Sequence, residues 1–261
     1  MERQQCFRAK ILNEYEITYL FCQSCGFLQT EEPYWLDKAY SSAIADSDTG
    51  LASRNIHISK QLASLLYFLF DKDGKYLDIA GGYGLLTRLM RDIGFDFYWS
   101  DLYCENIFAR GFELTSASQS FSAITAFEAL EHIYDPLSFI KKSLKQAKTS
   151  TIVFSTQLFN GSPPKPGWWY YTPETGQHIS FFQRSTLDFL ANQLSLNIYS
   201  YSNLHILTDK KINSALFRIL IGRLSSLLYP YVKKRMNSKT FLDREKISLI
   251  ISEGVKNENC V

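Results

Sequence analysis

The residues best suited to binding a ligand lie in a short glycine-rich segment. Asp78, Ala80, Gly81, Gly82 and Gly84 follow an apolar run and precede a stretch with helical apolar spacing. Glycine lets the backbone turn sharply and approach a ligand closely, and the first turn of a helix offers unpaired N–H groups. The order of residues therefore predicts a strand, a ligand-binding turn and a helix.

A second carboxylate is placed to complete that site. Asp101 ends the next predicted strand, 17 positions after Gly84, and can accept hydrogen bonds from two ribose hydroxyls. Helix capping at a solvated strand end is the alternative role. The turn lacks the third glycine of the G-x-G-x-x-G pattern that holds a dinucleotide pyrophosphate. Because Asp78 also favours a cationic ligand, a nicotinamide dinucleotide enzyme is a disfavoured alternative.

Two histidines are candidates for proton transfer. His178 lies in an aromatic loop, 160–182, that starts beyond a predicted strand end, and we interpret it as a general base. A buried, hydrogen-bonded structural histidine is the alternative. His132 follows two glutamates at another strand end and could act as a base or orient the acceptor, or it could simply bond to Glu128 or to the backbone. No metal ligand is assigned at this site.

These side chains need a parallel sheet to position them. Strand and helix signals alternate along the middle of the chain, as in a sheet covered by helices on both faces. We expect strands at 16–21, 75–80, 95–100, 122–127 and 150–155, with one or two more in 197–207. Helices are expected at 55–70, at 85–93 ending at Gly94, and at 135–147 capped by Asp135. A further helix, capped by Ser185, is expected to run to about Leu194.

Two segments resemble motifs of one enzyme family. Residues 78–84 resemble the D-x-G-x-G-x-G motif of class I S-adenosylmethionine-dependent methyltransferases, with Ala80 replacing the first glycine. Residues 126–132, Ala-Phe-Glu-Ala-Leu-Glu-His, resemble the family's E-x-L-E-H segment. The resemblance covers about 50–205. It implies an α/β, Rossmann-like, doubly wound sheet that is mostly parallel, with an antiparallel last strand.

The same resemblance implies how the cofactor, S-adenosyl-L-methionine, is held. Asp78 and the glycine turn would hold its methionine end, Asp101 with its neighbour Leu102 its ribose, and Glu128 would lie near the methyl group. The family often binds adenine through an acid after the third strand. Residues 115–121 contain none, so Ser118 or a backbone group would take that place.

Both ends of the chain extend the predicted domain of 51–208. Residues 1–50 contain Cys22 and Cys25, and they resemble a small zinc module found ahead of some bacterial methyltransferases; 41–50 suits a linker. With only Cys6 as a further candidate ligand, we interpret the module as degenerate, its cysteines packing as apolar residues. Residues 209–261 form a helical extension, with a basic amphipathic helix at 209–239 that Pro230 ends or kinks.

Composition limits the partners. The 261 residues are 46% apolar with a formal net charge of +2, so nothing in the charge demands a nucleic acid. The odd, scattered cysteines and the lack of an apolar leader favour the cytoplasm. The basic helix could contact a membrane surface, although packing on the main domain is its alternative.

We therefore expect a methyltransferase acting on a small-molecule acceptor, such as a sugar or glycan precursor. A non-catalytic, methyltransferase-like partner or cofactor-binding protein is the alternative, which Ala80 and the missing adenine acid favour.

Overall fold

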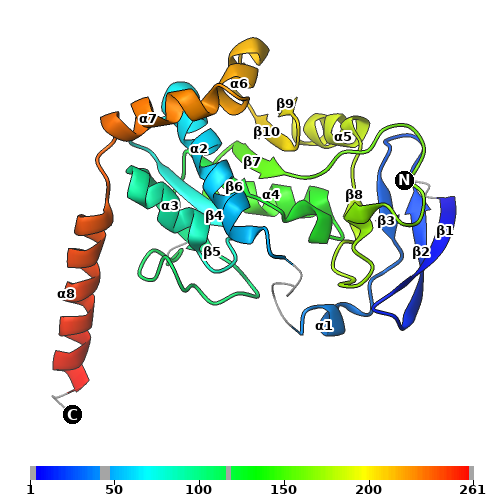
Figure 1. Cartoon of the computed structure of the whole chain (residues 1–261), viewed down its shortest axis with the longest axis horizontal. Coiled ribbons are helices and arrows are strands. Elements are labelled where there is room, and N and C mark those ends of the chain that lie inside the picture. Colours follow the sequence, from blue (N-terminus) through cyan, green and yellow to red (C-terminus); the bar gives the residue numbers. More distant parts are fainter. Residues whose placement is uncertain (1–3, 42–47, 116–118, 259–261) are drawn as a thin grey trace.

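The computed structural model of this chain describes residues 4–41, 48–115 and 119–258, with side chains as far as residue 252. A central six-stranded sheet forms the middle of the molecule (Figure 1). A four-stranded antiparallel sheet stands at one end, and the last helix projects from the other. Most of the predicted linker and Ser118 lie outside the described residues.

The central sheet has the predicted Rossmann-like topology. Its strand order is β5-β4-β6-β7-β10-β9, and the four strands β4 to β7 run parallel to their neighbours within that set. The last strand in sequence, β10, is antiparallel to both β7 and β9, as expected. The strands are β4 (Lys75–Ile79), β5 (Asp96–Ser100), β6 (Ala123–Ala126), β7 (Thr151–Ser155), β9 (Asn197–Tyr201) and β10 (Leu204–Thr208).

Helices cover both faces of this sheet because successive side chains of a strand point to opposite sides. Tyr76 and Val153 pack with α2 (Leu51–Leu69), α3 (Leu85–Ile93) and the helices that follow β10. Leu77 and Ile152 pack against α4 (Pro136–Ala147) and α5 (Arg184–Leu194). The predicted bounds of α3 and the cap of α4 by Asp135 are confirmed. The prediction that Ser185 caps α5 was wrong, since Gln183 occupies the N-cap and shares a capping box with Thr186.

A third parallel strand beside β5 is reduced to a single bridge, between Trp99 and Glu113. Glu113 accepts hydrogen bonds from the side chain of Asn106 and from the backbone N–H of Gly111. The Glu113 carboxylate is therefore occupied by hydrogen bonds within its own loop. It lies just before residues 115–121, where the family resemblance implies an adenine-binding acid.

The N-terminal strands do not form a separate unit. β1 (Gln4–Ile11), β2 (Tyr15–Phe21) and β3 (Leu28–Thr30) form an antiparallel sheet, and only β2 was predicted. The fourth strand is β8 (Ser180–Phe181), which comes from the loop after β7 and pairs with β3. A short helix, α1 (Leu36–Ala39), then leads toward the central sheet. Residues 4–41 and the main domain thus share a sheet and a hydrophobic core.

The Cys-x-x-Cys segment forms a tight turn between β2 and β3. Cys22 and Cys25 are buried in the core, and Cys6 lies exposed at an irregularity in β1. The carbonyl of Cys25 accepts hydrogen bonds from the hydroxyls of Ser185 and Thr186 at the start of α5. Among the described residues, no group of three potential metal ligands includes a cysteine. Sγ of Cys22 also lies 3.1 Å from the Ser24 hydroxyl, and the interpretation of the module as degenerate stays a prediction.

The prediction of one basic helix over 209–239 was wrong. The segment forms α6 (Ser214–Ile221) and α7 (Ser225–Arg235), whose axes bend by 81°. The break lies at Gly222, which takes an extended conformation where a Cβ would stand 2.6 Å from the Arg218 carbonyl. Pro230 sits inside α7 and does not end it. No single described helix is long and apolar enough to span a membrane, although α6 and α7 together reach the required length and composition.

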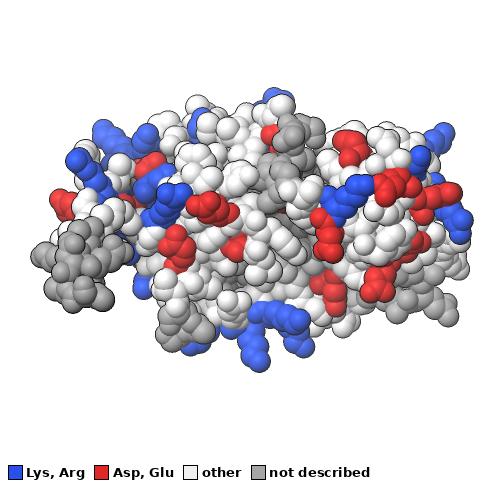
Figure 2. All heavy atoms as spheres, turned by 90° about the horizontal axis from the view of Figure 1, so that it is seen from below, with Lys and Arg blue, Asp and Glu red and all other residues white. Residues whose placement is uncertain are grey.

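The last helix, α8 (Thr240–Glu258), lies in the predicted helical extension, although no separate helix was expected there, and it projects from the body (Figure 1). Its start is held by a buried ion pair in which Asp243 accepts two hydrogen bonds from Arg91 of α3, at 2.7 and 2.8 Å. Basic and acidic side chains are interspersed on the face shown in Figure 2, and neither sign covers it. Contact of 209–239 with a membrane stays a prediction.

Candidate functional site

A cavity of about 560 Å³ opens at the carboxyl ends of the parallel strands, where open α/β sheets bind their ligands. It brings together most of the predicted residues, which come from four separate parts of the chain. Gly84 and Leu102 are the exceptions: neither lines the cavity, and Leu102 is 90% exposed. The predicted residues that do line it are Asp78, Ala80, Gly81, Gly82, Asp101, Glu128, His132 and His178.

The turn between β4 and α3 is shaped by left-handed backbone conformations. Ala80 has φ of 58° and Gly82 has φ of 53°, so the chain reverses tightly over the cavity. Gly84 plays a packing role, because a Cβ there would stand 2.5 Å from Oδ1 of Asn106. Of the left-handed residues in this turn, Ala80 is the one that carries a Cβ, and this conformation is strained for an L-residue with a Cβ.

Asp101 is fixed at the tip of β5 by backbone amides. Its Oδ2 accepts a hydrogen bond of 2.9 Å from the N–H of Gly82, which ties the strand tip to the turn. Its Oδ1 accepts from the N–H groups of Tyr103 and Cys104, at 2.8 and 2.9 Å. A carboxylate has about four acceptor positions, so Oδ2 keeps capacity for a ligand hydroxyl. The side chain is held ready in one orientation.

Asp78 lies at the bottom of the turn and is almost fully buried. The hydroxyl of Thr125 on β6 donates a hydrogen bond of 2.7 Å to its Oδ1. Burial raises the pKa of Asp78 to about 7, and the charge of Asp101 adds to the effect. A cation in the cavity would favour the ionised form and reverse this shift.

The wall of the cavity is acidic. Its described lining residues include five carboxyl groups and one guanidinium, that of Arg54. Arg54 already contacts Asp48 at 2.6 Å and Glu128 at 3.8 Å. The remaining negative charge favours a cationic ligand and opposes one with phosphates, because like charges repel strongly in a partly desolvated site. The carboxyl groups belong to Asp48, Asp78, Asp101, Glu128 and Glu174.

Two histidines meet on the far side of the cavity. The rings of His132 and His178 lie 4.8 Å apart, centroid to centroid, and nearly perpendicular. Nδ1 of His178 donates a hydrogen bond of 2.7 Å to the Tyr170 carbonyl, which leaves Nε2 as the nitrogen with a lone pair. Nδ1 of His132 lies 3.0 Å from the Tyr40 hydroxyl. His178 is therefore both hydrogen-bonded in the loop and exposed to the cavity, so the two roles predicted for it are compatible.

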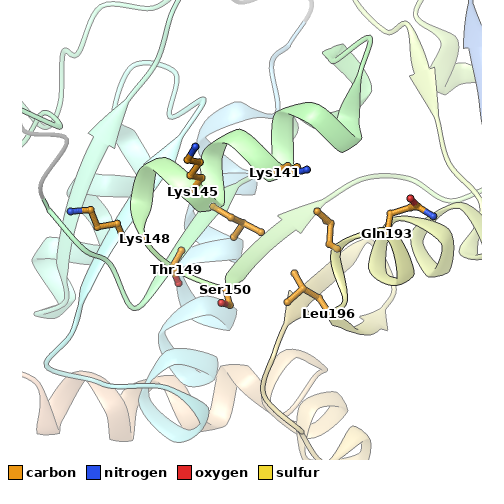
Figure 3. Close-up of a pocket in the computed structure, with 9 residues that line it drawn as sticks. Lys141, Lys145, Lys148, Thr149, Ser150, Gln193 and Leu196 are labelled. Carbon is orange, nitrogen blue, oxygen red and sulfur yellow. The ribbon is translucent and has the colours of Figure 1, made fainter.

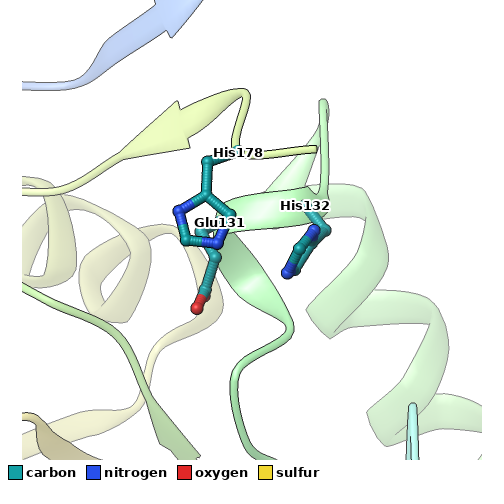
Figure 4. Close-up of side chains that lie close together, drawn as sticks. All are labelled: Glu131, His132 and His178. Carbon is teal, nitrogen blue, oxygen red and sulfur yellow. The ribbon is translucent and has the colours of Figure 1, made fainter. Parts of the chain in front are cut away.

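Glu131 lies beneath these rings and completes a cluster of three side chains (Figure 4). It is fully buried, and neither of its carboxyl oxygens makes a hydrogen bond of full geometry among the described residues, although the Tyr170 hydroxyl interacts with the group. Burial raises the pKa of Glu131 to about 8, and the charge of Glu128 contributes. Burial also lowers the pKa of His132 to about 3 and that of His178 below its usual value, so both rings are neutral near pH 7.

Several site residues were not identified from the sequence. Tyr40 comes from the N-terminal segment, 92 positions before the histidine it touches, and its ring stacks on Tyr103. Arg54 had no motif to indicate it. Glu131 did have a signal, because it is the second acid of the segment Glu-Ala-Leu-Glu-His at 128–132.

A second hollow of about 420 Å³ lies between the end of α4 and the end of α5 (Figure 3). It is open, and three lysines, three leucines and three uncharged polar residues line it: Lys141, Lys145, Lys148, Leu144, Leu194, Leu196, Thr149, Ser150 and Gln193. None of the predicted site residues lies in it. The chemistry of the molecule is therefore concentrated in the first cavity.

Comparison with known proteins is consistent with this geometry. The model of a family described as "Methyltransferase domain" matches residues 54–201. No curated protein matches the chain.

Three solved structures are similar at low sequence identity. TnmH is 16% identical with a TM-score of 0.47, over 68% of this chain and 62% of that one. An O-methyltransferase family protein from Burkholderia thailandensis is 13% identical with a TM-score of 0.47, over 66% and 61%. An S-adenosylmethionine-dependent methyltransferase from Thermotoga maritima, described as a possible histamine N-methyltransferase, is 12% identical with a TM-score of 0.44, over 67% and 97%. This chain spans about three fifths of the length of the first two.

Proposed function

This chain belongs to the methyltransferase domain family, and we propose that it transfers the methyl group of S-adenosylmethionine to a small, uncharged acceptor such as a sugar. One observation carries the proposal. A single cavity joins the glycine turn to the histidine-bearing loop, and its wall contains five carboxyl groups and one guanidinium.

The residues of the turn fit the proposed methyl donor. S-adenosylmethionine carries an ammonium and a sulfonium and no phosphate, and when bound it supplies an activated methyl group. Asp78 and the backbone of the turn would hold the amino-acid end, and Asp101 would accept a hydrogen bond from a ribose hydroxyl. Both carboxylates are already oriented, by Thr125 and by three backbone N–H groups respectively. Such preorganisation lowers the entropy lost on binding.

The rest of the cavity would hold the acceptor. Trp169 is 68% exposed at its edge, and Tyr40 and Tyr170 line its wall, so planar or sugar-like faces can pack there. Transfer is an in-line displacement, so the chain mainly has to align two molecules and exclude water. The proton that the acceptor loses would leave toward the two histidines, whose rings are neutral near pH 7 and of which His178 keeps a lone pair on Nε2.

The charge of the wall predicts which acceptors react. Release of S-adenosylhomocysteine would be measured with neutral sugars and glycosides and with the corresponding nucleotide sugars. We expect neutral acceptors to show a kcat/KM at least about tenfold higher, because the carboxylates repel a pyrophosphate. A preference for the nucleotide-linked sugars would contradict this proposal. Donor binding without turnover on any acceptor would favour the non-catalytic alternative.

Trp169→Ala tests the acceptor wall directly. We expect it to raise the KM for the acceptor about tenfold while leaving donor affinity unchanged, because a stacked aromatic ring is worth about 1 kcal/mol or more. Tyr34→Ala is the matched control, since Tyr34 is similarly exposed at 63% but lies outside the cavity. Equal KM values for the two variants would remove Trp169 from the acceptor site.

A further inference from the structure

We propose that Glu131, His132 and His178 bind one divalent transition-metal ion in the floor of the cavity, and that this ion holds and activates the acceptor's oxygen. The second half of this statement rests on the proposed methyl transfer, whereas the first half stands alone. One ring nitrogen of each histidine and one carboxyl oxygen of Glu131 lie within 4.8 Å of one another.

The three side chains come from two segments that the fold brings together. Glu131 and His132 lie on the short helical turn η1 (Leu130–His132) that follows β6, and His178 lies just before β8. The backbone joins the two segments, because the N–H of Ile179 donates a hydrogen bond of 2.8 Å to the Glu131 carbonyl. Metal–ligand bonds of about 2 Å place neighbouring ligand atoms roughly 3 Å apart, so closing the site needs only small side-chain rotations.

The burial of Glu131 is the independent observation that points to a cation. Its side chain is inaccessible to solvent, and neither oxygen makes a hydrogen bond of full geometry among the described residues; the Tyr170 hydroxyl interacts with this carboxyl group more weakly. Buried polar groups are nearly always well paired, and a poorly paired buried carboxyl group needs an explanation. The guanidinium of the cavity, Arg54, is paired with Asp48 and forms no ion pair with Glu131, although its charge favours the ionised carboxylate. A bound cation would supply a full partner.

The surroundings of the histidines suit ligands rather than free bases. Metal-bound histidines usually donate their second ring N–H to a carbonyl or carboxylate, which fixes the ring. His178 does this through Nδ1 to the Tyr170 carbonyl at 2.7 Å. The ring of His132 is held by the Tyr40 hydroxyl, 3.0 Å from its Nδ1, and by a hydrogen bond with the backbone of Gln177. Both rings are thus oriented by groups outside the cluster.

The ligand set indicates the kind of metal and its use. Two imidazoles and one carboxylate suit Zn²⁺, Fe²⁺, Mn²⁺ or Co²⁺ better than Mg²⁺ or Ca²⁺, which prefer oxygen ligands. Three protein ligands leave positions open, as in catalytic sites. A hydroxyl bound at an open position would lose its proton more readily, and the proton would pass to water in the cavity because both histidines are occupied as ligands. The acceptor oxygen would then form its bond to the methyl group as the methyl–sulfur bond breaks, and S-adenosylhomocysteine would leave. The acidic wall also attracts cations.

The test uses the full chain after removal of metal with a chelator. Zn²⁺, Mn²⁺, Co²⁺ and Mg²⁺ are each titrated by calorimetry, and bound metal is counted by elemental analysis. We expect one equivalent of a transition metal with a micromolar or smaller Kd, and weaker binding of Mg²⁺. Affinity should fall at least tenfold in Glu131→Gln and in His178→Asn, because each loses a ligand. Glu174→Gln, which removes a cavity carboxylate outside the cluster, should leave it unchanged.

Thermal unfolding, a cysteine variant and S-adenosylmethionine affinity provide three further tests. Bound metal should raise the thermal unfolding midpoint of the unsubstituted chain, so the result does not depend on whether a variant folds. Binding lost only in Cys22→Ser would assign the metal to the cysteine turn and overturn the proposal, as would no binding at all. S-adenosylmethionine affinity, measured without metal, reports on the proposed function separately. Turnover that is equal with and without bound metal would overturn the activating role alone.

Discussion

Replacing Ala80 by glycine is expected to stabilise the protein although it removes a methyl group. Ala80 has φ of 58°, and a left-handed backbone costs a residue with a Cβ roughly 1–2 kcal/mol. Glycine avoids this penalty but adds about 0.5–1 kcal/mol of unfolded-state entropy. The net gain is about 0.5–1 kcal/mol, which corresponds to roughly 1–4 °C in Tm for a chain of this size.

Chemical and thermal unfolding of Ala80→Gly would measure this gain. Ala52→Gly is the control, because Ala52 is also exposed but has a right-handed helical backbone in α2. There the same replacement should lower the free energy of unfolding by up to about 1 kcal/mol. If both variants lost stability alike, Ala80 would not be strained, and alanine at this position would cost the protein no stability.

Two further predictions concern the frame around the site. Burial lowers the pKa of His205 to about 4, so as pH falls from about 6.5 to about 4 the unfolded chain binds its proton first and the native state loses stability. In urea unfolding, His205→Gln should remove up to about 3 kcal/mol of that loss, and an unchanged pH dependence would contradict it. The buried Arg91 forms ion pairs with Asp243 and Asp96, so Asp243→Ala removes one of these two described acidic partners. We expect a loss of about 3 kcal/mol in the free energy of unfolding, and a loss below about 0.5 kcal/mol would refute the anchoring role of this pair.

Local signals in the sequence were enough for the elements that carry the glycine turn. Helix α3 begins directly after Gly84 and ends at Gly94, and both glycines have positive φ. The glycines that predicted the bounds of the helix are therefore the residues that end it in the structure. Asp135 and Pro136 likewise predict a helix start from their own chemistry. The positions of Asp78 and Asp101 then follow from parallel strands that end at one edge.

Contacts between distant segments could not be predicted in the same way. β8 has only two residues and no period of its own, and it exists because β3 pairs with it. The contact of Tyr40 with His132 depends on that same packing of the N-terminal segment. In the C-terminal segment the apolar spacing continues across Gly222, so the sequence predicts one helix where the chain bends. Leu102 follows Asp101 yet is exposed outside the cavity, so its contact with the cofactor stays a prediction.

The central claim is that the acidic turn binds S-adenosylmethionine, and calorimetric titration tests it most directly. The full chain, Asp101→Ala and the control Glu105→Ala would each be titrated with S-adenosylmethionine and S-adenosylhomocysteine. Glu105 is an exposed acid in the same loop that does not line the cavity. We predict micromolar binding to the unsubstituted chain and to the control. Asp101→Ala should bind roughly 10- to 150-fold more weakly, because a hydrogen bond to a charged group is worth about 1.5–3 kcal/mol. Absence of binding to the unsubstituted chain, or equal affinity in Asp101→Ala, would contradict the account.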